Sequence, residues 1–134
     1  HQVAKFDFGK ASFATEIASA RTFCMKKDVD TMRANGLARG GSLENAIVVD
    51  EGKILNQDGL RFENEFVRHK ILDSVGDLFL AGAHIMGEFV GVRSGHKLNN
   101  QILLAMAENP HSFELVAPST SNGFSFTSRP VLAY

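Results

Sequence analysis

One stretch, residues 64–82, organises this sequence: Asn64-Glu-Phe-Val-Arg-His-Lys-Ile-Leu-Asp-Ser-Val-Gly-Asp-Leu-Phe-Leu-Ala-Gly82. Its apolar residues recur every three or four positions, the spacing of an amphipathic helix. They are Phe66, Val67, Ile71, Leu72, Val75, Leu78 and Phe79. His69, Asp73 and Asp77 follow at intervals of four, so a helix would place them along one stripe. An imidazole and two carboxylates beside an apolar face indicate a functional site.

Length and composition are those of one globular domain. The chain has 134 residues, 44% of them hydrophobic and 22% charged, and can bury a core of its own. A formal net charge of −1 gives no general attraction to nucleic acid, so we expect no nucleic-acid partner. No apolar run is long enough to span a bilayer, so we expect no transmembrane segment, although peripheral membrane contact stays open. The single cysteine, Cys24, excludes an intrachain disulfide and favours a reducing compartment.

The chain begins at His1 rather than Met, so a processed product and one part of a longer protein both stay open. Its first residues alternate as in a strand and do not resemble a signal peptide. Period-2 alternation, apolar runs and turn signals predict strands, and helical periodicity predicts two further helices. The strands are expected at 3–8, 12–23, 46–49, 84–92 and 112–116, the helices at 26–35 and 96–108, and a loop at 118–128. Strands clustered early in such a mixture predict an α+β fold with two layers.

His69 and Asp73 have the residue types of zinc ligands, an imidazole nitrogen and a carboxylate oxygen. Their spacing alone fits an ordinary helix hydrogen bond or surface ion pair equally well. Two ligands are also too few, since a catalytic zinc usually takes three from protein. The spacing therefore leaves a metal site and a surface pair both open.

Asp77 has two interpretations as well. It can be a charge on a helix surface, or it can orient the imidazole of His96 at the start of the helix expected at 96–108. An imidazole supported by a carboxylate can act as general acid or as an electrostatic stabiliser. Lys70 and Arg93 are either solvated charges or, near a metal, contacts for an anion.

Five blocks of sequence carry a family resemblance. They are Ala20-Arg-Thr-Phe23, the run from Gly40 to Asp50, the run from Asp58 to Phe62, the run from Glu65 to Asp73, and Ser94-Gly-His-Lys-Leu-Asn-Asn-Gln101. Together they closely resemble the UDP-3-O-acyl-N-acetylglucosamine deacetylases of Gram-negative bacteria, which are zinc amidases of lipid A biosynthesis. The match runs from about residue 6 to about residue 116, with the motifs in the family's order and spacing.

The resemblance implies that residues 1–134 are the second, C-terminal domain of such an enzyme. Members have two similar α+β domains, and the second is a two-layer sandwich of a mixed β-sheet packed on helices. It carries a strand-helix-strand insert, expected here at about residues 23–50. The N-terminal domain, which the matched blocks lack, supplies the third zinc ligand and the glutamate general base. That domain is therefore an expected partner.

For the catalytic residues, the resemblance implies that His69 and Asp73 bind Zn²⁺, which activates water for amide hydrolysis. His96 would stabilise the oxyanion and protonate the leaving amine, with Asp77 holding its ring. Thr22 would add a hydroxyl near the developing oxyanion. The implied substrate is UDP-3-O-acyl-N-acetylglucosamine and the implied location is the cytoplasm.

For the substrate, the resemblance implies that Lys70 makes a direct contact and that the insert walls a hydrophobic passage for the acyl chain. The residues expected to bind substrate there are Phe23, Val29, Gly41, Ala46 and Val48. Arg93 stands where many relatives have lysine and would contact the diphosphate through a planar fork of donors.

Two functions from different classes therefore follow from the sequence. The first is a zinc deacetylase, complete only with its N-terminal domain, so that the isolated chain is expected to be inactive. The alternative is an isolated, non-catalytic domain that binds acyl-chain ligands. A plain α+β domain whose polar residues have no common function is a third interpretation.

Overall fold

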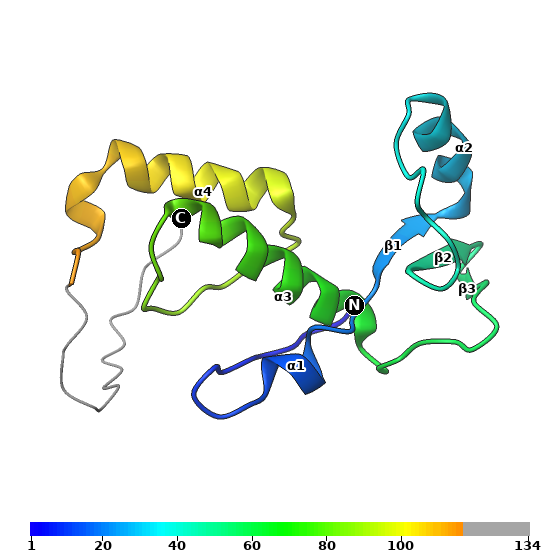
Figure 1. Ribbon diagram of the computed structural model, residues 1–134, viewed down its shortest axis with the longest axis horizontal. Helices are drawn as coiled ribbons and strands as arrows, with labels where there is room; N and C mark the ends of the chain where they lie inside the picture. The colour runs from blue at the N-terminus through cyan, green and yellow to red at the C-terminus, as the bar shows by residue number, and fades with distance from the viewer. Residues whose placement is uncertain (117–134) are drawn as a thin grey trace. The chain divides into compact units, whose positions relative to one another are not determined.

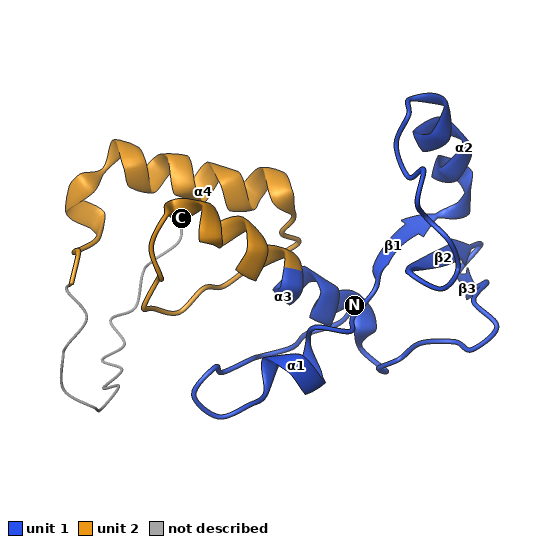
Figure 2. Cartoon of the chain, in the orientation of Figure 1, with its two compact units in different colours: residues 1–72 blue, residues 73–134 orange. Residues whose placement is uncertain are grey.

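The computed structural model describes residues 1–116. Its helices and strands follow in the order α1 Phe13–Glu16, β1 Thr22–Met25, α2 Lys26–Ala34, β2 Ala46–Asp50, β3 Lys53–Ile54, α3 Glu65–Leu78, the 3₁₀ helix η1 Phe79–Ala81, α4 His96–Glu108 and the 3₁₀ helix η2 Pro110–Ser112 (Figure 1). The predicted α+β class is confirmed. The chain divides into two compact units, residues 1–72 and residues 73–134 (Figure 2).

A mixed sheet of three strands lies in the first unit. β1 and β2 are parallel, with Thr22 opposite Ala46, while β2 and β3 are antiparallel. Parallel neighbours need a crossover, and α2 provides it and contacts both strands. β2 and β3 need only the tight turn Glu51-Gly52, where both residues have positive φ, 47° and 79°, as in the hairpin turns that match strand twist. The predicted strand-helix-strand segment is thus present.

Asn56 holds the sheet to the loop that precedes it. Its side chain is 6% exposed and donates to the carbonyl oxygens of Leu43 and Ala46, at 2.6 and 2.8 Å. Its Oδ1 accepts from the N–H of Val48 at 3.0 Å. Buried amides of this kind satisfy backbone groups that no strand reaches. Ile47, fully buried in β2, marks the apolar centre of this unit.

A buried ion pair joins the start of α3 to the segment before β1. The Glu65 carboxylate is 0% exposed and the Arg21 side chain 6% exposed. Arg21 donates from Nε to Oε1 at 2.9 Å and from Nη2 to Oε2 at 3.0 Å. The backbone N–H groups of Arg21 and Arg61 donate to the same carboxylate at 2.9 and 2.6 Å. Four hydrogen bonds therefore offset the cost of burying this charge.

The second unit differs from the first in which of its side chains are buried. Its buried residues within 73–116 are polar, namely Ser74, Ser94 and Asn99, whereas many of its large apolar side chains are exposed. The most exposed of these are Phe79, Leu80, Val90, Val92, Leu104 and Leu115. Among the described residues, no helix has the length and apolar content that crossing a bilayer requires.

Several predicted strands are wrong. Residues 3–8, 84–92 and 112–116 form no strand. Within the strand expected at 12–23, Phe13–Glu16 form the helix α1, and only Thr22 and Phe23 belong to a strand, β1. Alternation marks a segment that suits a sheet, but a strand also needs a neighbour to pair its backbone, and within residues 1–116 the first three segments pair with no strand. Alanines within 12–23 also favour a helix. The helices at 26–35 and 96–108 and the strand at 46–49 are confirmed within two residues. The loop at 118–128 lies outside the described residues.

Replacing Arg21 with methionine would leave the Glu65 carboxylate buried without its main partner. We expect the free energy of unfolding to fall by about 3–5 kcal/mol, the usual cost of breaking a buried pair. Denaturant titration measures the loss. The matched control is Arg33→Met on the exposed face of α2, where a change within about 0.5 kcal/mol is expected. Equal stabilities for the two variants would contradict the prediction.

The same pair predicts an acid dependence. Burial alone would raise the pKa of Glu65, but the hydrogen bonds from Arg21 and Arg61 outweigh it and lower the pKa to about 2. A lowered carboxyl pKa stabilises the fold fully above the ordinary value, and the stabilisation is lost as the pH falls towards the lowered value. Stability should therefore decline between about pH 4.5 and pH 2. Glu65→Gln should flatten this decline in acid unfolding curves, whereas Glu63→Gln, at an exposed neighbour, should leave it unchanged.

Candidate functional site

α3 carries four of the predicted site residues, and the helix is formed where the sequence predicts it. His69 and Lys70 belong to the first unit, whereas Asp73 and Asp77 belong to the second. In a helix, positions 69, 73 and 77 recur along one stripe, as the spacing predicts.

His69 is held by the backbone of the segment before β1. Its Nδ1 lies 3.1 Å from the carbonyl oxygen of Ala20. A carbonyl oxygen can only accept, so this contact assigns the proton to Nδ1 and the ring's lone pair to Nε2. Metal-binding imidazoles are commonly oriented in this way, with the second nitrogen donating to a carbonyl or carboxylate. The donor chemistry of His69 therefore fits a metal ligand that binds through Nε2.

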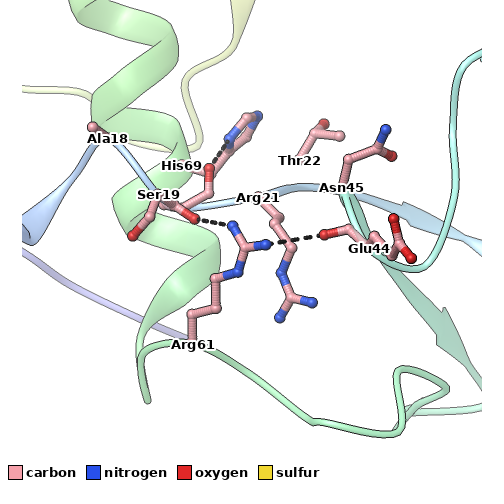
Figure 3. A pocket seen from close by; sticks show the side chains of 9 residues that line it. Ala18, Ser19, Arg21, Thr22, Glu44, Asn45, Arg61 and His69 are labelled. Atoms are coloured by element: carbon pink, nitrogen blue, oxygen red, sulfur yellow. Dashed lines mark hydrogen bonds between the residues drawn. The ribbon is translucent and has the colours of Figure 1, made fainter.

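A pocket of about 350 Å³ lies next to His69 in the first unit (Figure 3). Thr22 and His69 both line it, so the structure brings together two residues that the sequence assigned to one site. Arg61 donates to the carbonyl oxygens of Ser19 at 2.8 Å and Glu44 at 3.1 Å, drawn as dashed lines in Figure 3. Its guanidinium thus ties two sides of the pocket together.

Lys70 and Phe23 are also neighbours. The Lys70 Nζ lies 5.7 Å from the centre of the Phe23 ring, within the range of a cation–π contact. The same ring meets Phe66 edge-on at 5.0 Å and His69 at 6.1 Å. Phe23, on β1, therefore lies between an apolar neighbour and two predicted site residues of α3.

In the second unit, Asp77 holds the ring of His96, the first residue of α4. The His96 Nδ1 lies 2.8 and 3.0 Å from the two carboxylate oxygens. A carboxylate only accepts, so Nδ1 carries the proton in this contact and Nε2 is the ring nitrogen that Asp77 does not hold. The His96 side chain is 74% exposed, against 20% for Asp77. The predicted pairing of Asp77 with His96 is present in this geometry.

Asn99, to which the sequence assigns no role, supports this pair. Its side-chain nitrogen donates to Asp77 Oδ2 at 2.8 Å and to the Ser74 hydroxyl at 3.4 Å, and the residue is 1% exposed. Burial would raise the pKa of Asp77, but hydrogen bonds from Asn99 and His96 outweigh it and lower that pKa below its ordinary value. Asp77 is therefore kept ionised beside the His96 ring.

The other predicted substrate residues are spread over the first unit and the loop before α4. Val29 lies on α2, Val48 and the buried Ala46 on β2, and Gly41 on an exposed loop. None of these lines the pocket beside His69, and their role along an acyl passage stays a prediction. Arg93 has φ of 52°, a left-handed conformation that is uncommon for arginine and is often found at functional loops.

Arg21, Glu65 and Asn99 are functional candidates that sequence reasoning missed. All three lie inside the blocks that carried the family resemblance. Two of them could have been noticed from their spacing: Glu65 lies one helical turn before His69, and Asn99 lies one turn after His96. Within residues 1–116, no cluster of three or more His, Cys, Asp or Glu side chains is placed to hold a metal.

Comparison with known proteins gives a consistent result. The sequence model of LpxC, UDP-3-O-acyl N-acetylglycosamine deacetylase, matches residues 1–108. A UDP-3-O-acyl-N-acetylglucosamine deacetylase of Alcanivorax borkumensis is 49% identical over 99% of this chain, and one of Marinobacter nauticus is 50% identical over 86% of it. The family model and both relatives are named deacetylases, so the sequence similarity indicates this class of enzyme. The chain belongs to the UDP-3-O-acyl N-acetylglycosamine deacetylase family. It spans 44% and 38% of the length of these two relatives.

The role of Asn99 can be tested through Asp77. Replacing Asn99 with leucine removes a donor that stabilises the carboxylate, so we expect the pKa of Asp77 to rise. Carbon NMR of the Asp77 carboxyl against pH measures it. The control is Asn100→Leu, at the exposed next position of α4, which should leave the Asp77 pKa unchanged. An Asp77 pKa that does not respond to Asn99→Leu would contradict the assignment.

Proposed function

We propose that this chain is the C-terminal domain of a zinc-dependent UDP-3-O-acyl-N-acetylglucosamine deacetylase that acts in lipid A biosynthesis in the cytoplasm. The observation that carries the proposal is the orientation of both imidazoles, His69 by a backbone carbonyl and His96 by Asp77. The identity to relatives that carry this enzyme name supports the substrate and the amide bond that is hydrolysed.

His69 and Asp73 are the proposed zinc ligands in this chain. The protonated Nδ1 of His69 supports binding through Nε2, and the four-residue spacing within α3 supports Asp73 as the second ligand. When bound, zinc supplies the activation of water and the polarisation of the acetamide carbonyl. The third ligand and the glutamate base are proposed to come from the N-terminal domain.

His96 is the proposed general acid. Asp77 accepts from its Nδ1, so Nε2 is left to give a proton to the leaving amine, and a carboxylate beside the ring favours the protonated form that such a donor needs. Asn99 keeps the Asp77 carboxylate in place for this role. The protonated ring also offers positive charge to the developing oxyanion.

Thr22 and Lys70 are proposed to act on the substrate in the first unit. The hydroxyl of Thr22 would donate to the oxyanion, which its place in the pocket beside His69 supports. Lys70 would contact the substrate, with its Nζ already set over Phe23. The acyl passage along Phe23, Val29, Gly41, Ala46 and Val48 and the diphosphate contact of Arg93 are carried over from the family.

The N-terminal domain is proposed as the main protein partner. The chain covers less than half of either relative, and the second unit exposes large apolar side chains such as Phe79, Leu80 and Val92. Exposed apolar surface of this kind usually marks an interface. Contact with further parts of a longer protein would cover it.

The test is a chimera in which this chain replaces the matching segment of the Alcanivorax borkumensis relative. We expect zinc-dependent release of acetate from UDP-3-O-acyl-N-acetylglucosamine. His69→Ala should abolish zinc binding and turnover. His96→Gln should lower kcat by on the order of 100-fold with zinc retained, because only the proton donor is lost.

The matched control is His84→Ala, which removes an imidazole that packs against Phe79 rather than one of the proposed site. It should retain zinc and turnover. Near-normal turnover in His69→Ala would overturn the deacetylase assignment. A folded chimera that binds acyl ligands without hydrolysing the substrate would favour the non-catalytic binding domain instead.

A further inference from the structure

One peptide group, between Ala20 and Arg21, is held at both of its polar ends by α3. Its N–H donates to Glu65 Oε1 at 2.9 Å, and its carbonyl oxygen lies 3.1 Å from His69 Nδ1. Glu65 and His69 are four residues apart, so they lie one turn apart on one helix face. Because a peptide group is planar, fixing its N–H also fixes the direction of its carbonyl.

Glu65 is itself immobilised. Its two oxygens accept from the Arg21 guanidinium at 2.9 and 3.0 Å and from the Arg61 N–H at 2.6 Å, in addition to the Arg21 N–H. Arg21 Nη2 also donates to the carbonyl of Gly59 at 2.8 Å. With the carboxylate fully buried, this set of bonds leaves it one position. The carbonyl that meets His69 is therefore aimed by a rigid network.

We propose that Glu65, fixed by Arg21, is a positioning residue for the His69 imidazole. Its carboxylate holds the Ala20–Arg21 peptide so that the Ala20 carbonyl accepts from Nδ1–H. That contact selects the tautomer with its lone pair on Nε2 and sets the plane of the ring. The choice of His69 tautomer follows from the contacts of the Ala20–Arg21 peptide alone, while its consequence for metal binding rests on the proposed function.

A purely structural ion pair would have a different signature. It would stabilise the first unit, and its loss would lower stability without changing the tautomer of His69 or the affinity for a metal. A positioning role makes two further quantities depend on Glu65. These are the position of the ring proton in the metal-free protein and the coordination of the metal in the loaded protein.

The experiment uses the chimera described above with Glu65→Gln. The glutamine keeps the size of the side chain, but its NH₂ cannot accept from the N–H donors that face one of the carboxylate oxygens. Nitrogen NMR of the metal-free protein should show His69 as the Nδ1–H tautomer in the parent and a growing share of Nε2–H in the variant. Zinc affinity, from competition with a chromogenic chelator, should fall by about 10- to 100-fold, the usual effect of removing an outer support. The visible spectrum of bound Co²⁺ should change as well.

The matched control is Asn56→Ala, which removes buried hydrogen bonds to Leu43, Ala46 and Val48 and leaves the Ala20–Arg21 peptide untouched. It should lower stability and leave the tautomer, the zinc affinity and the Co²⁺ spectrum as in the parent. If Glu65→Gln does not fold, Arg21→Lys takes its place, because it keeps the charge and the backbone N–H but loses the guanidinium fork. A smaller shift in the same direction is then expected.

A folded variant with the parent's tautomer, zinc affinity and Co²⁺ spectrum overturns the inference and leaves Glu65 a structural residue. A parent chimera that binds no zinc overturns the proposed function instead, and the tautomer measurement then decides the positioning role by itself. Loss of the Nδ1–H tautomer in Glu65→Gln, with the tautomer kept in Asn56→Ala, supports the inference.

Discussion

The buried pair of Arg21 and Glu65 is the constraint on which the first unit depends. A charged carboxylate with no exposed surface is tolerated only when each of its oxygens is satisfied, and here every donor comes from a segment that the fold must bring together. The donors are Arg21, just before β1, and the N–H of Arg61, while the first turn of α3 supplies the accepting carboxylate. Arg21 and His69 both line the pocket of this unit.

The second unit uses a smaller network for a related purpose. Asn99, Asp77 and His96 form a chain of hydrogen bonds in which a buried amide holds a carboxylate and the carboxylate holds an exposed imidazole. The buried end supplies rigidity, and the exposed end is where a proton can be exchanged. The Oδ1 of Asn99 has no hydrogen-bond partner within the described residues, so the orientation of this amide rests on its two donor contacts.

Both networks share one design, in which a histidine that is expected to do chemistry is oriented by a group that does none. A backbone carbonyl orients His69 and a carboxylate orients His96. The choice fits the proposed roles. A neutral carbonyl selects a tautomer for binding a metal without adding charge, whereas a carboxylate adds the negative charge that favours a protonated ring.

The sequence by itself determined the helices of α3 and α4, the strand β2 after its crossover helix, and the four-residue spacing of His69, Asp73 and Asp77. These features depend on local periodicity and on turn residues, which can be read from neighbouring positions along the chain. The family was also evident from its motif blocks. Only the tertiary structure decided that residues 3–8 and 84–92 form no strand, because pairing requires a partner that alternation cannot reveal. It also decided that Glu65 accepts from the N–H of Arg21 and that Asn99 donates to Asp77. These contacts join residues 44 and 22 positions apart, which spacing along the chain cannot reveal.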